Sequence, residues 1–130
     1  MRVASREYVG KSLNIDKLAD SIEEYFQIQG YKTQSEKRPD GWIIQARKEG
    51  VLRGLLAADR AFTVTITGEP NNVKISIGIG RWLLNLGTAI IEGLALAPFV
   101  LLVEIPITLW SFEIENKFWQ FVEKEVELQV

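Results

Sequence analysis

The sequence of 130 residues predicts a single α+β domain: an N-terminal helix, a four-stranded antiparallel sheet built from two hairpins, and a C-terminal helix. Three observations predict this fold class. Apolar residues recur at helical spacing near both ends of the chain, they alternate with polar residues between those ends, and turn-forming residues separate the alternating runs. Residues 1–130 are expected to form one domain, into which 82–110 inserts an apolar helical hairpin before the C-terminal helix.

The first predicted element is a helix over 14–29. Its apolar residues share one stripe and are Ile15, Leu18, Ala19, Ile22 and Phe26. Asn14 is a suitable N-cap, and Gly30 is a suitable stop after the last turn.

Two β-hairpins are predicted to follow. The first joins extended segments at 31–36 and 42–47 through a turn at 38–41, and the second joins 62–67 and 73–79 through a turn at 68–72. In the second hairpin β-branched and aromatic side chains alternate with Thr, Ser, Lys and Gly, which predicts a sheet with one dry and one wet face. Between the hairpins, 49–60 is expected to be a loop with a helical turn.

The last predicted element is a helix over about 112–128, with a short strand at 125–130 as the alternative for its end. Its broad apolar side is formed by Ile114, Phe118, Trp119, Phe121, Val122 and Val126. Together with the first helix, this element can cover the dry face of the sheet.

Composition excludes several classes of function. The chain has no Cys and no His, so disulfides, thiolate nucleophiles, imidazole metal sites and His-centred triads are impossible. The formal net charge of −2 argues against a dedicated nucleic-acid binder. We therefore expect no enzymatic activity, no catalytic residue, no metal and no cofactor. The lack of Cys and His, with many Ile, Glu and Lys, also resembles the composition of thermophile proteins.

The segment 82–110 is strongly apolar, but the core of the predicted domain is complete without it. Its only charged residues are Glu92 and Glu104, and no Lys or Arg occurs between Arg81 and Lys117. Leaving this surface in water costs about 25 cal/mol per Å². The segment should therefore enter a bilayer or pack against another copy of the chain, because an extra layer on the polar sheet face is less favourable.

The prolines of this segment favour a helical hairpin over one spanning helix. Pro98 and Pro106 interrupt backbone hydrogen bonding, which predicts two short arms over 82–97 and 99–110. Residues expected to contact a bilayer or another copy are Trp82, Leu83, Leu86, Ala89, Ile90, Gly93, Leu94, Ala97, Phe99, Leu102, Ile105 and Trp110. Asn85, Ala89, Gly93 and Ala97 form a ridge of small or hydrogen-bonding residues suited to close helix packing.

Two further sets of residues are candidates for function. Glu92 and Glu104 are expected to be buried ionisable groups, or points at which a surface helix meets water. Lipid headgroups would contact a set of basic residues, namely Arg47, Lys48, Arg53, Arg60 and Arg81.

These observations predict a non-enzymatic, membrane-associated domain that binds lipid and associates with copies of itself. The alternative is a soluble homo-oligomer or apolar-ligand carrier that buries 82–110 between subunits or around a cavity. Because the first residues carry no apolar run, we expect no secretory signal peptide. The expected location is cytoplasmic, peripheral or monotopic at the inner face of the cell membrane, with no nucleic-acid partner.

Overall fold

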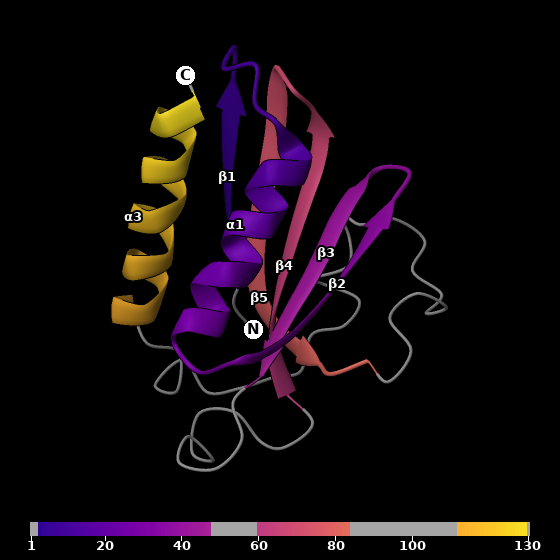
Figure 1. The fold of residues 1–130 in the computed structure, drawn as a ribbon, viewed down its shortest axis with the longest axis vertical. Coiled ribbons are helices and arrows are strands. Elements are labelled where there is room, and N and C mark those ends of the chain that lie inside the picture. Colours follow the sequence, from indigo (N-terminus) through magenta and orange to yellow (C-terminus); the bar gives the residue numbers. More distant parts are fainter. Residues whose placement is uncertain (1–2, 48–59, 84–111, 130) are drawn as a thin grey trace.

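The computed structural model describes residues 3–47, 60–83 and 112–129. These residues form a five-stranded antiparallel sheet of strand order β1-β5-β4-β3-β2, with two helices over one face (Figure 1). The elements are β1 (Val3–Val9), α1 (Ile15–Ile28), β2 (Lys32–Arg38), β3 (Gly41–Arg47), β4 (Arg60–Glu69), β5 (Asn72–Arg81) and α3 (Phe112–Gln129).

The prediction of four strands is wrong, because β1 adds a fifth strand that pairs antiparallel with β5. The alternation of apolar residues in β1 is interrupted at Arg6, which lies opposite Ile75 in the register. The Arg6 guanidinium lies 5.0 Å from the ring centroid of Trp119 and forms an ion pair with Glu123. Arg6 therefore occupies a position of β1 at which an alternating pattern would have an apolar side chain. For this reason the pattern does not predict the strand.

The predicted apolar helical hairpin is not supported either. Most of 82–110 lies outside the described residues, but Trp82 and Leu83 follow β5 without helical structure. The backbone N–H of Leu83 donates to the Gln45 side chain at 3.0 Å, and the Leu83 carbonyl accepts from Gln34 at 2.8 Å. These hydrogen bonds hold the chain beside the sheet where the first helical arm was predicted to begin. None of the helices in the described part of the chain is long and apolar enough to cross a membrane.

The two predicted helices and both predicted hairpins are confirmed. The Asn14 side chain caps α1 by accepting from the Lys17 N–H at 3.0 Å, and Gly30 follows with φ +90°. β2 pairs with β3, and β4 pairs with β5. α3 remains helical to Gln129, so the alternative strand at its end is wrong. The loop predicted at 49–60 lies outside the described residues, except that Arg60 begins β4.

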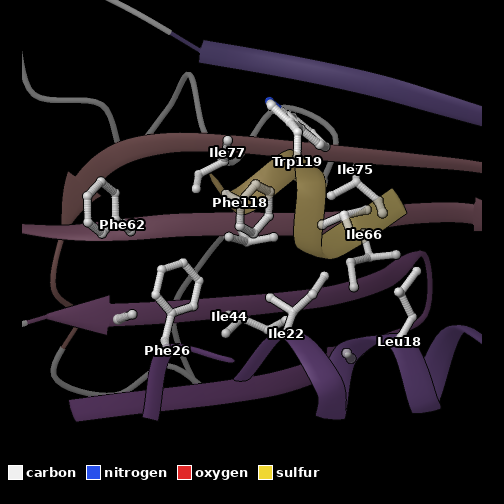
Figure 2. Close-up of a cluster of buried hydrophobic side chains, with 14 of the residues drawn as sticks. Leu18, Ile22, Phe26, Ile44, Phe62, Ile66, Ile75, Ile77, Phe118 and Trp119 are labelled. Carbon is white, nitrogen blue, oxygen red and sulfur yellow. The ribbon is translucent and has the colours of Figure 1, made fainter. Parts of the chain in front are cut away.

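The core lies between the helices and one face of the sheet (Figure 2). Phe26 of α1 stacks on Phe62 of β4 and on Phe118 of α3, with both pairs of ring centroids 6.0 Å apart. Burying a side chain of this size contributes about 1.5–3 kcal/mol. This aromatic cluster therefore fixes both helices against the centre of the sheet.

The second face of the sheet, predicted to be wet, is buried at its centre. Gln45, Thr63 and Ser76 are at most 2% exposed. Their polar groups bond to one another and to neighbouring strands: Gln45 donates to the Thr63 hydroxyl at 3.1 Å, and the Ser76 and Ser5 hydroxyls are 2.8 Å apart. Because paired polar groups can be buried at modest cost, a Thr- and Ser-rich pattern does not require a solvated face.

Asp16 connects the first turn of α1 to the β2–β3 hairpin. Its carboxylate accepts from the Trp42 indole N–H at 2.8 Å and lies 3.0 Å from the Lys37 ammonium. The Trp42 hydrogen bond, followed by that from Lys37, lowers the pKa of Asp16 below its ordinary value.

This lowered pKa predicts a pH-dependent contribution to stability. Because the folded-state pKa lies below the unfolded value of about 3.9, the contacts stabilise the fold above that pH. Their contribution is lost as pH falls through the folded-state pKa. We expect Asp16→Asn to lower the melting temperature at pH 7, with the difference from wild type narrowing below about pH 4. Thermal unfolding across this range provides the measurement, and a difference independent of pH would contradict it.

Candidate functional site at the basic end of the sheet

Four neighbouring strands terminate in basic residues at the same end of the sheet. β2 begins at Lys32 and β3 ends at Arg47, and these two residues are directly opposite in the register. β4 begins at Arg60 and β5 ends at Arg81, which also oppose each other. We call these four positions the basic end; it is the lower end of the sheet in Figure 1.

The charge pattern at this end differs from that at the other end of the sheet. In the described strands, the last two register positions at the basic end contain no Asp or Glu. At the opposite end charges are mixed, and Glu7 of β1 directly opposes Lys74 of β5. Opposite charges across strands stabilise a sheet, whereas like charges such as Lys32 and Arg47 destabilise it. An anionic ligand at the basic end would relieve this repulsion.

Lys32 of β2 and Arg47 of β3, which share one face of the sheet because they are directly opposed, both lie near the ring of Trp82. The Arg47 guanidinium lies 4.5 Å from the Trp82 ring centroid, and the Lys32 ammonium lies 5.9 Å from it. Both distances are within the range of cation–π attraction. The indole, which is half-buried, therefore offsets part of the repulsion between the two cations and keeps them beside each other.

Two glutamines hold the chain that carries Trp82. Gln45 is fully buried and donates to the Arg81 carbonyl at 2.7 Å, while its side-chain oxygen accepts from Leu83 N–H at 3.0 Å and from Gln34 at 2.8 Å. Gln34 also donates to the Leu83 carbonyl at 2.8 Å. The carbonyl of Arg81 before Trp82 and both backbone groups of Leu83 after it are thus fixed by side chains of β2 and β3. Sequence reasoning assigned no role to these glutamines.

Tyr31, adjacent to Lys32, adds no negative charge to the basic end. Burial, and next the neighbouring Tyr25, raise the pKa of the Tyr31 phenol above its ordinary value of 10.0. The phenol is therefore neutral near pH 7. Within the ranges 3–47, 60–83 and 112–129, no group of three or more Asp or Glu side chains is arranged to hold a metal ion.

The structure places some of the residues predicted to contact lipid at the same end of the sheet, but on opposite faces: Arg81 shares the face of the core residue Ile79, whereas Arg47 follows the core residue Ala46 and lies on the other face. Arg81 is exposed, Arg47 is half-buried, and Arg60 occupies the register position opposite Arg81. Trp82 and Leu83 lie beside them and are half-buried. The other predicted site residues lie outside the described residues: Lys48, Arg53, Leu86, Ala89, Ile90, Glu92, Gly93, Leu94, Ala97, Phe99, Leu102, Glu104, Ile105 and Trp110.

Lys32 belongs to the basic end but was missing from the sequence-based set. A usable signal existed, because the turn at Pro39 and Asp40 defines the register of the first hairpin and places residue 32 opposite residue 47. The register of this hairpin, extended from its turn, predicts that Lys32 lies opposite Arg47.

Comparisons with known proteins assign no family. No protein-family model matches the chain, and a search of the curated proteins found no similar sequence. The function must therefore be argued from the arrangement of the residues themselves.

Proposed function

We propose that this protein is a non-enzymatic, membrane-associated domain that binds anionic lipid headgroups through the basic end of its sheet. The observation that carries the proposal is that each of the strands β2 to β5 terminates there in Lys or Arg. Phosphate-bearing headgroups carry the charge opposite to that of these strand termini and are attracted to them.

The expected strength of this attraction supports a reversible association. Each Lys or Arg near an anionic leaflet contributes about 1 kcal/mol, so Lys32, Arg47 and Arg81 together contribute about 3 kcal/mol. Trp82 and Leu83 follow immediately after Arg81 and add half-buried apolar side chains next to the cations at this end. Indole rings favour the headgroup level of a bilayer, which agrees with a tryptophan at this point. The anionic inner leaflet of the cell membrane is the proposed location.

A charge-removal variant tests the proposal in the full chain. We expect Lys32→Gln/Arg81→Gln to bind vesicles of mixed phosphatidylcholine and phosphatidylglycerol about twentyfold to thirtyfold more weakly than wild type, because two cations are lost. Wild-type binding should also weaken with added salt. Vesicle flotation over a range of lipid concentrations provides the measurement.

The matched control is Lys11→Gln/Lys17→Gln, which removes the same charge from exposed positions near the opposite end of the sheet. This control should bind the vesicles nearly as wild type does. Equal binding of wild type and of both double variants would overturn the proposal. So would binding to a single-stranded RNA in place of the anionic vesicles, since that would assign the basic end to nucleic acid.

A further inference from the structure

A surface groove separates α1 from α3. It has a volume of about 600 Å³, and it is lined only by residues of these helices and by Gln29. Tyr25 of α1 and Phe121 of α3 meet in it with ring centroids 4.5 Å apart. Ile28, the last residue of α1, lines the groove and is 78% exposed. An apolar floor with an exposed large aliphatic side chain at its edge is typical of a protein contact surface.

The walls of the groove carry different charges. α1 contributes Glu24, whereas α3 contributes Lys117 and Lys124 together with Glu125. No ion pair joins Glu24 to Lys124 across the groove in the described structure. These four charges sum to zero, so the groove has no preference for a partner of one sign. It is instead suited to a surface that carries the same charges in the reverse arrangement.

A second copy of the chain supplies that arrangement. The two helices run antiparallel (Figure 1). A two-fold rotation about an axis parallel to the helices and above the groove places α1 of each copy over α3 of the other. The contact of Tyr25 with Phe121 sets the relative height of the helices, so Glu24 of one copy lies only about 3 Å along the axis from Lys124 of the other. The rotation pairs these two charges twice, once on each side of the axis.

We propose that the groove between α1 and α3 is an isologous interface between two copies of this chain. Each Glu24 contacts Lys124 of the other copy, and each Ile28 packs over the α3 helix of the other copy, toward Phe121. An interface of this kind uses one self-complementary patch on both subunits.

The same symmetry has a consequence for the basic ends. Because rotation about an axis parallel to the helices does not invert their direction, both basic ends point to the same side of the dimer. Two basic ends can then contact one surface together, which strengthens binding through avidity. The interface itself rests only on the groove and does not depend on the proposed lipid binding.

A charge swap tests this interface in the full chain. We expect Glu24→Lys or Lys124→Glu alone to raise the dimer dissociation constant about tenfold, because each places like charges opposite each other at two symmetric sites. The double variant Glu24→Lys/Lys124→Glu should return the constant to within about threefold of wild type, since it restores both pairs in reverse. Sedimentation equilibrium over a range of protein concentrations provides the measurement.

Lys11→Glu is the control, because it changes charge by the same amount at an exposed position that does not line the groove. It should leave the dissociation constant unchanged. A wild-type protein that remains monomeric, or an oligomer unaffected by either single variant, would overturn the proposed interface. So would a double variant that fails to recover while its melting temperature matches wild type. None of these results decides whether anionic vesicles bind at the basic end, so the two proposals fail separately.

Discussion

Replacing Phe118 by Ala is expected to lower the free energy of unfolding by about 3–5 kcal/mol. Phe118 is fully buried, and its ring contacts the rings of Phe26, Trp119 and Tyr25 at centroid distances of 6.0, 5.0 and 6.2 Å. Truncation removes the buried ring and leaves a cavity between α1, α3 and the sheet (Figure 2). Since small domains have total stabilities of about 5–15 kcal/mol, this loss is a large fraction of the whole.

Urea unfolding followed by circular dichroism measures this effect. Leu128→Ala is the matched control, because it removes an apolar side chain from the same helix at a position that is 70% exposed. It should change the free energy of unfolding by no more than about 0.5 kcal/mol. Similar losses in the two variants would show that Phe118 does not anchor α3 to the core.

Replacing Gly41 by Ala is expected to cost about 3–4 kcal/mol, the second largest effect. Gly41 begins β3 with φ +148°, a conformation that residues with a side chain rarely adopt. An added Cβ would lie 1.8 Å from the carbonyl oxygen of Ile66 in β4, so backbone must move. The displacement would disturb the register of β3 against β4, in which Gly41 is opposite Thr67.

Gly10→Ala separates this clash from backbone strain alone. Gly10 also has a positive φ, +74°, but a Cβ there meets no atom within 4 Å. Its expected cost is therefore only the left-handed conformation, about 1–2 kcal/mol. Thermal and urea unfolding of the two variants should show the larger loss for Gly41→Ala. The reverse order would contradict the assignment of the cost to the contact between β3 and β4.

The elements predicted correctly from the sequence are those encoded by local spacing. The apolar stripe from Ile15 to Phe26 and the cap at Asn14 suffice for α1, and the turns at 38–41 and 68–72 suffice for two hairpins. The prediction failed at β1, where a strand pairs with β5 about seventy residues away and carries Arg6 on the helix side. A local sequence pattern cannot indicate that Arg6 will lie against Trp119, because Trp119 belongs to a helix far along the chain.

The candidate site could be predicted only in part for the same reason. Arg47, Arg60 and Arg81 were identified as basic residues near an apolar segment, but their common position depends on strand pairing. The role of Gln45 depends on four partners from three parts of the chain: Gln34 in β2, Thr63 in β4, and Arg81 and Leu83 at the end of β5. Its type and spacing contain no indication of those partners.

By itself, the sequence determined the helices α1 and α3, the two β-hairpins and the absence of Cys and His chemistry, because these follow from residue types and short spacings. It also showed basic residues next to an apolar stretch. Tertiary structure alone decided the fifth strand, the burial of the Thr-rich face and the gathering of four basic strand termini. These features arise from antiparallel pairing between distant segments, and such pairing depends on which side chains can satisfy one another across the sheet.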